Sequence, residues 1–269
     1  GGGAWLWAQA TARPPGAAPV EVFGTGQDAR AGGRVVAVRG DRVEVWFVGA
    51  RGGNTGIGRL AVSADGRWVA AVTSSGQLAV IDAATGALHG QVQASWLGEA
   101  RAVVFVDGDR QLVTIGDDGY LRRWDRDTLA ARDAAELGVG MLLTLEAHGD
   151  VVAVGSRQGT TVVWDAARWA PVQRHGSRGE ATLVAKLDPS GRWLVTADER
   201  GSVCLHRVDR PGCVPLVGHR LGTPVRAAAF LADGTVVTGG DDGTVRHWRP
   251  PADATARSEE HTSELQSRQ

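Results

Sequence analysis

The sequence predicts an all-β protein built from repeated four-stranded antiparallel sheets. A segment of thirteen residues recurs with a period near forty, and its clearest copies, residues 112–124 and 236–248, superimpose without a gap. Each copy contains two short, largely apolar runs separated by a polar turn. A four-stranded unit of this length can cover its two faces only with its neighbours, so the units are expected to stack radially. The expected fold class is therefore a β-propeller.

The elements of one period follow from its apolar and turn residues. Each copy opens with a β-rich apolar strand, and the turn after it ends in a glycine that can adopt the positive φ of a tight hairpin. The second strand has alternating or continuous Val and Leu. A further turn and strand precede four of the copies, and an outer strand such as 172–174 follows. One period thus supplies four strands, and no segment has a helical period.

The number of copies predicts the number of sheets, and each copy is marked by its last residue. These last residues are Trp7, Trp46, Ile81, Trp124, Trp164, His206 and Trp248, spaced 35 to 43 residues apart. Seven such residues predict seven blades, incomplete at both ends, with the chain entering inside the third strand of the first blade. The last blade is expected to stop after its third strand, leaving an open ring with unpaired edges. The short segment 46–60 makes the second blade the least regular.

Two dipeptides point to a known family. Trp124-Asp125 and Trp164-Asp165 each close a copy, and Gly218-His219 precedes the last one. In these features residues 1–250 resemble WD-repeat (WD40) β-propellers. The resemblance implies a protein that binds other proteins and performs no chemistry of its own.

The resemblance also implies buried polar side chains within the blades. An Asp fixes the tautomer of a His, the His bonds a hydroxyl, and the hydroxyl accepts an indole N–H, so that every buried polar group has a partner. The expected set is His219, Thr238, Asp242 and Trp248 in the last repeat, with Thr114, Asp118, Trp124 and Trp164 in earlier ones. The Trp124 repeat has Ser95 at the His position. His, Asp and a hydroxyl also suggest a catalytic triad, but their positions within one repeat favour the structural role.

Signs of catalysis are sparse elsewhere. No two histidines have the spacing of a metal site, and neither a phosphate-binding loop nor a nucleophile elbow is present. The Asp pairs at 117–118 and 241–242 fall in hairpin turns, where Asp is favoured. We expect no enzyme, no cofactor and no metal. The alternative, a propeller hydrolase or lactonase, would need His, Asp or Glu at the inner-strand starts, where this sequence has mostly Ala, Val and Arg.

The two cysteines, Cys204 and Cys213, are too few for a disulfide framework or a four-ligand zinc site. Cys204 lies within an alternating apolar run. It is expected to act as a small hydrophobic residue of the core.

The C-terminal residues differ from the rest of the chain. Eleven consecutive residues from Arg257 resemble the translation of a sequencing-library adapter, so 257–269 is expected to be a disordered artefactual tail after a linker at 251–256. The formal net charge is -1, and it is zero without this tail. A neutral average gives no reason to expect nucleic acid or an anionic membrane as partner. No apolar run is long enough to span a membrane.

Without a catalytic motif, the function is expected to reside in the protein surface. In propellers of this family the loops entering the inner strands and the middle hairpin turns share one face. The candidate partner-binding residues there are Trp96, Arg101, Arg178, Arg220, Leu221, Asp117 and Asp241. Trp and Arg are common interface anchors, and Trp96 is the best candidate, although a Trp packed between blades is equally compatible with the sequence.

The expected function is a protein–protein interaction scaffold. The family resemblance suggests a module of a larger cytoplasmic signalling protein, linked to a kinase or an NTPase. Arginine in place of lysine, with abundant Ala, Gly and Val, suggests a bacterial source. The alternative is a sensor propeller that binds a peptide or a small ligand.

Overall fold

The computed structural model describes residues 56–176 and 179–249 in full, together with the backbone of the strands 6–12, 20–25, 33–39 and 42–48. The fold is all-β, and the described residues contain no helix. Accordingly, no helix long and apolar enough to cross a membrane occurs among them. The predicted linker and tail, 251–269, lie outside the described residues.

The strands form six antiparallel sheets. The first contains β1 (Leu6–Ala12), β2 (Val20–Thr25), β3 (Gly33–Arg39) and β4 (Arg42–Val48). The second contains β5 (Ile57–Val62), β6 (Trp68–Thr73), β7 (Gln77–Asp82) and β8 (Leu88–Gln93). The third contains β9 (Ala100–Val106), β10 (Gln111–Gly116), β11 (Tyr120–Asp125) and β12 (Ala131–Glu136).

The remaining sheets continue the series. The fourth contains β13 (Leu142–His148), β14 (Val151–Ser156), β15 (Thr160–Asp165) and β16 (Ala170–Gly176). The fifth contains β17 (Thr182–Leu187), β18 (Trp193–Asp198), β19 (Val203–Arg207) and β20 (Val214–Pro215). The last contains β21 (Val225–Phe230), β22 (Val236–Gly240) and β23 (Val245–Trp248). Within each sheet, strands adjacent in sequence are paired.

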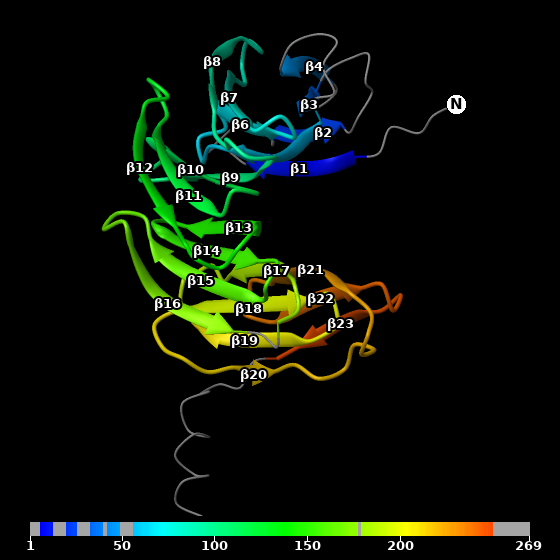
Figure 1. Cartoon of the computed structure of the whole chain (residues 1–269). Coiled ribbons are helices and arrows are strands. Elements are labelled where there is room, and N and C mark those ends of the chain that lie inside the picture. Colours follow the sequence, from blue (N-terminus) through cyan, green and yellow to red (C-terminus); the bar gives the residue numbers. More distant parts are fainter. Residues whose placement is uncertain are drawn as a thin grey trace, which may run out of the picture.

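The sheets pack face to face in chain order. The first strands contact one another in series, β1 with β5, β5 with β9, and so on to β17 with β21. Figure 1 shows the resulting arc, which runs from the blue first sheet to the orange last sheet. The cores lie between neighbouring sheets: Trp68 and Val72 of the second sheet pack with Leu112 and Trp124 of the third. This is the propeller-like blade arrangement that the repeat predicted, and it follows because each sheet covers the apolar face of the next.

The hairpin glycines adopt the predicted conformation. The turns between the second and third strands of five sheets contain Gly76, Gly119, Gly159, Gly201 and Gly243, with φ between +74° and +88°. At Gly76 an added Cβ would lie 2.5 Å from the carbonyl oxygen of Ser95. A side chain is therefore excluded there both by backbone conformation and by the approach of the next loop.

The predicted number of blades differs from the sheets observed. The copy at 35–46 does form a hairpin, with Val35 opposite Trp46, but β3 and β4 are the third and fourth strands of their sheet. Trp7 lies in β1 of this same sheet rather than in a preceding blade. The reason is chain length: the eight residues 49–56 between β4 and β5 leave no room for a further strand and its two connections. The seven repeat ends thus correspond to six sheets in the described residues.

The last sheet has three strands among the described residues, where β23 pairs with β22 alone. The predicted end of this blade falls at residues 250 onward, which lie outside the described residues. Val245, at the start of β23, is 69% exposed.

Candidate interaction surface

The last sheet contains the complete polar set implied by the sequence. Trp248 Nε1 donates to Thr238 Oγ1 over 2.8 Å, and Thr238 Oγ1 lies 2.7 Å from His219 Nε2. His219 Nδ1 lies 2.9 Å from Asp242 Oδ2. Since the carboxylate only accepts, Nδ1 carries the proton, and Nε2 accepts from the threonine hydroxyl. Each polar side-chain atom in this hydrogen-bonded set therefore has a partner.

The carboxylate of Asp242 also bonds two loops to this hydrogen-bonded set. It accepts the backbone N–H of Arg220 and the hydroxyl of Thr244, and these bonds hold the pKa of Asp242 well below its usual range. The side chain of His219 has no exposed surface, and Thr238 is 1% exposed. A buried hydroxyl whose hydrogen bonds are already made cannot meet a substrate, so this His, Asp and Thr are structural.

In the third sheet the buried aspartate pairs with an arginine and not with a histidine. Trp124 Nε1 donates to Thr114 Oγ1 over 2.8 Å, as expected. Ser95 does not bridge to Asp118, and its hydroxyl donates instead to Leu97 O. Asp118 pairs with Arg122 over 2.9 Å, with side-chain exposures of 3% and 10%. Burial alone would raise the pKa of Asp118, but its hydrogen bonds from Arg122 and from backbone N–H groups lower it.

Arg122 was not predicted from the sequence. It stands two residues before the repeat's tryptophan, where the next repeat has the fully buried Val162. The available signal was a charged residue at this position, where the last repeat also has an arginine, Arg246.

Trp164 does not belong to the hydrogen-bond set. Its repeat has Val154 at the threonine position, and in the part of the chain that the structure describes its indole nitrogen is buried without a partner. Trp164 instead packs against Trp169, with ring centroids 5.5 Å apart at an interplanar angle of 75°. It is thus a core residue held by packing.

The fifth sheet replaces tryptophan by histidine. His206 Nε2 lies 2.9 Å from Thr196 Oγ1, the bond that an indole makes in the third and last sheets. His206 Nδ1 donates to the carbonyl oxygen of Gly212 over 2.8 Å. The cysteine expectation was wrong: Cys204 and Cys213 form a disulfide, with Cα atoms 5.6 Å apart. The connection from β19 to β20 folds back onto β19 and so brings the two residues within bonding range, which sequence spacing did not reveal.

Trp96 is exposed rather than packed between blades. Its residue exposure is 71%, and that of the adjacent Leu97 is 73%. The loop between β8 and β9 that carries them is fixed, because the Trp96 N–H donates to Asp118 Oδ2 and the Glu99 N–H donates to Asp117 Oδ2, each over 3.2 Å. The loop thus presents two large apolar side chains on an anchored backbone.

Arg101 and Asp117 are paired with each other. Arg101 Nε lies 2.5 Å from Asp117 Oδ1, and Arg101 also contacts Glu99. Asp241 makes the equivalent pair with Arg226 over 2.8 Å in the last sheet. Both arginines occupy the second residue of an inner strand, where the register shifts by a β-bulge. Arg226 was missed, although it matches Arg101 in repeat position.

Arg220 and Leu221 lie on the loop before β21, and both are exposed, Leu221 to 80%. Val217, on the same connection, is 83% exposed and was missed. This loop is the repeat equivalent of the Trp96 loop, so both enter inner strands at the same end of the blades. Arg178 lies outside the described residues.

Comparison with known proteins identifies one repeat directly. Residues 213–249 match the family described as WD domain, G-beta repeat. The chain contains a WD40 repeat. That repeat holds the whole polar set of the last sheet, from His219 to Trp248. The six repeated sheets and this WD40 repeat together are consistent with a WD-repeat propeller.

A curated relative extends the similarity beyond the WD40 repeat. Cilia- and flagella-associated protein 44 of Trypanosoma brucei brucei is 29% identical over 154 residues, which is 55% of this chain and 8% of that protein. The chain therefore spans a small part of the relative's length. WD40 repeats mediate protein–protein interactions in general, so the similarity favours an interaction module.

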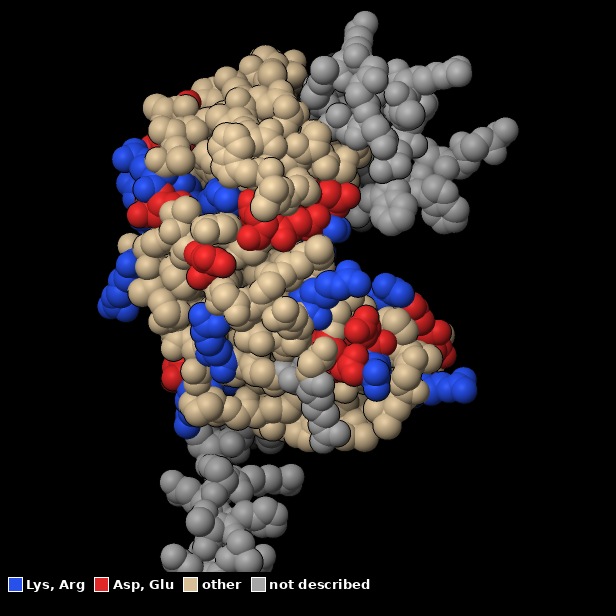
Figure 2. Space-filling view, viewed as in Figure 1, with Lys and Arg blue, Asp and Glu red and all other residues tan. Residues whose placement is uncertain are grey.

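The charged residues of the surface are mixed in sign. Figure 2 shows Lys and Arg side chains lying next to Asp and Glu side chains over the face in view. Many are paired, as Arg101 with Asp117 and Arg226 with Asp241. Among the described residues, no group of three or more His, Cys, Asp or Glu is placed to hold a metal ion.

Proposed function

We propose that this chain is a non-catalytic protein-interaction module that binds its partner through the Trp96 loop. The observation that carries the proposal is the exposure of Trp96 and Leu97 on an anchored loop. Two large apolar side chains in water are unfavourable for a free protein, and burying an indole in a partner's pocket is a common source of binding energy. A backbone fixed before binding loses little entropy on association.

The second loop of the proposed surface contributes Arg220 and Leu221. Arg220 is free to project because its backbone N–H, and not its guanidinium, is the group bound to Asp242. We assign the Arg101–Asp117 pair to the rim of this surface, where it would set orientation more than affinity. Nucleic acid and membrane surfaces are not proposed as partners, since the charges of both signs are interspersed.

The wider setting is also a proposal. A cytoplasmic module of a larger signalling protein, linked to a kinase or an NTPase, is supported by the family resemblance and by the modest share of the relative that the chain covers. The bacterial source rests on composition alone, whereas the relative comes from a trypanosome.

The proposal is tested by capture with the whole chain as bait, in lysate of the source cells. Wild type is compared with Trp96→Ala and with the matched control Leu88→Ala, which removes an apolar side chain 51% exposed on the outer strand β8. Loss of one hot-spot side chain should weaken binding of the captured partner by about tenfold or more, with Leu88→Ala unchanged. Equal capture by a folded Trp96→Ala variant would refute the assignment of this loop.

A further inference from the structure

The connection between β19 and the last sheet differs from the other outer strands. We call residues 209–217 the strap. Its only strand, β20, has two residues, whereas the outer strands β8, β12 and β16 have six or seven. Pro215, one of the two, has no N–H to donate to the ladder. The strap therefore has little of the backbone pairing that holds other outer strands.

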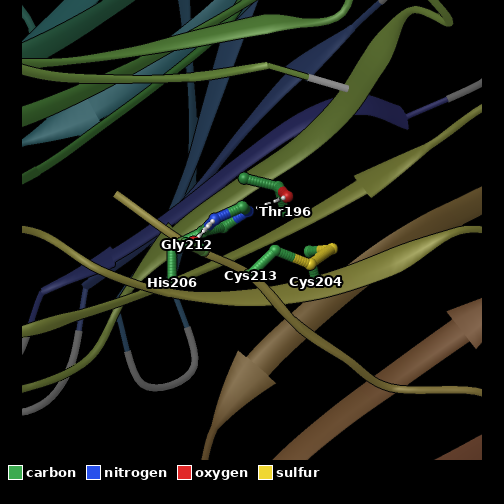
Figure 3. The surroundings of a disulfide bond; sticks show 5 residues. All are labelled: Thr196, Cys204, His206, Gly212 and Cys213. Carbon is green, nitrogen blue, oxygen red and sulfur yellow. Dashed lines mark hydrogen bonds between the residues drawn. A yellow bond between two sulfur atoms is a disulfide. The ribbon is translucent and has the colours of Figure 1, made fainter. Parts of the chain in front are cut away.

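Several other contacts hold the strap against β19, among them the ion pair of its Asp209 with Arg207 over 3.1 Å. The disulfide joins its Cys213 to Cys204, and the carbonyl of its Gly212 accepts the Nδ1 proton of His206. Leu216 is 9% exposed within the core of the fifth and last sheets, and its N–H donates to Val203 O over 2.9 Å. Figure 3 shows the disulfide and the imidazole of His206 side by side on β19, facing the strap.

Both ends of the strap are fixed without the disulfide. Before it, Val208 is 7% exposed, and its N–H donates to Arg192 O over 3.0 Å. After it, His219 is held by Asp242 and Thr238. The ladder of β17, β18 and β19 is complete without β20. Loss of the disulfide should therefore free a segment between two fixed points and leave the blades intact.

We propose that Cys204–Cys213 is a reversible thiol–disulfide exchange site that controls whether the strap is docked. Cys213 is exposed and stands among the exposed residues 209–213, so a reductant can reach it. Cys204 is half-buried on β19. The two are nine residues apart in sequence, so the bond constrains the strap and not the contacts between distant sheets.

The exchange requires a dithiol reductant. A thiolate of the dithiol attacks the sulfur of Cys213, the bond to Cys204 breaks, and Cys204 leaves as a thiolate that takes up a proton. The second thiol of the reductant then attacks the mixed disulfide, which releases Cys213 as a thiol and leaves the reductant as a disulfide. Two electrons pass from the dithiol to the cysteine pair. In a reducing compartment such disulfides are transient and regulatory, which agrees with the cytoplasmic setting proposed above.

The test is hydrogen exchange of the whole chain, oxidised and in excess dithiothreitol, read by mass spectrometry. Reduction should speed exchange in peptides covering the strap by about tenfold or more, because the Leu216 N–H loses its protection. Exchange in β12 (Ala131–Glu136), an outer strand of another sheet without a cross-link, should not change. Oxidised glutathione should restore slow exchange after the dithiol is removed.

The double variant Cys204→Ser, Cys213→Ser is the matched control, and its strap should exchange fast with or without the dithiol. Three results would overturn the proposal. Alkylation could show that the disulfide resists the dithiol in the folded protein. The disulfide could open with no change in the strap. Exchange could instead rise equally in β12, which would show that the disulfide stabilises the whole fold.

Discussion

The polar chain of the last sheet predicts a measurable difference between two threonines. Thr238 hydrogen-bonds two nitrogens, the buried His219 Nε2 and the partly buried Trp248 Nε1, whereas Thr114 hydrogen-bonds Trp124 Nε1 alone. Thr→Val keeps the side-chain shape and removes only the hydroxyl. Thr238→Val therefore leaves two nitrogens without a hydrogen-bond partner, and Thr114→Val leaves one.

The magnitudes follow from the cost of a buried polar group without a partner, about 1–3 kcal/mol each. Thr114→Val should lower the free energy of unfolding by about 1–3 kcal/mol. Thr238→Val should lower it by about 2–6 kcal/mol, towards the lower part of that range because Trp248 is only partly buried. The expected difference between the two variants comes from the imidazole of His219. Its side chain has no exposed surface, so Nε2 cannot bond water in place of the hydroxyl.

Urea unfolding followed by far-UV circular dichroism measures these values, provided the variants share one m-value. A third variant isolates the histidine. In a His219→Leu background no Nε2 is left to strand, so Thr238→Val should cost only what Thr114→Val costs. A coupling energy near zero between His219 and Thr238 would refute the hydrogen-bonded chain, as would equal costs for the two threonines in the wild type.

Three further predictions concern the other sheets. Burial, with the nearby histidine of β19, lowers the pKa of His175 from 6.5 to about 4. The neutral form is thus favoured on folding, so the resulting stability is present above pH 6.5 and is lost as the pH falls through about 4. His175→Leu should remove up to about 3 kcal/mol of this acid sensitivity, which thermal unfolding at pH 7 and pH 4 would detect, and an unchanged pH profile would contradict it. Arg122→Met should cost about 3–5 kcal/mol by leaving Asp118 charged and buried, and adding Asp118→Asn should recover part of that cost in urea unfolding; no recovery would show that the arginine acts by packing. Val154→Thr should give the indole of Trp164 its missing acceptor and stabilise by about 1 kcal/mol, whereas in a Trp164→Phe background it should destabilise; the same sign in both backgrounds would refute the pairing.

The repeat made most of the fold predictable from sequence. The hairpin glycines and the alternating Val and Leu runs located the strands from β5 onward, and all five hairpin glycines have positive φ. Local pattern sufficed because each blade is formed by strands adjacent in the chain. The predicted seven blades differ from the six sheets of the described residues, because Trp46 resembles the end of a third strand and lies in a fourth strand instead. The length available between β4 and β5 decides that assignment.

The side-chain networks were predictable only where the residues matched the repeat. His219, Thr238, Asp242 and Trp248 did match, and the structure joins them as expected. Where a residue departed from the pattern, its replacement came from a position that sequence comparison does not pair with it. Arg122 reaches Asp118 from the following strand.

The fifth sheet shows how such replacements interact. His206 stands where other sheets have tryptophan, and unlike an indole it has a second nitrogen, which bonds the carbonyl of Gly212. That bond draws the chain back over β19 and brings Cys213 to Cys204. Beside these contacts, β20 pairs with β19 over two residues only. The histidine at the tryptophan position thus anchors the strap next to the disulfide. His206→Trp should uncouple them: the indole can bond Thr196 but not Gly212, so the strap should exchange faster even with the disulfide intact. If exchange in the strap stayed slow in that variant, the cross-link alone would account for its docking.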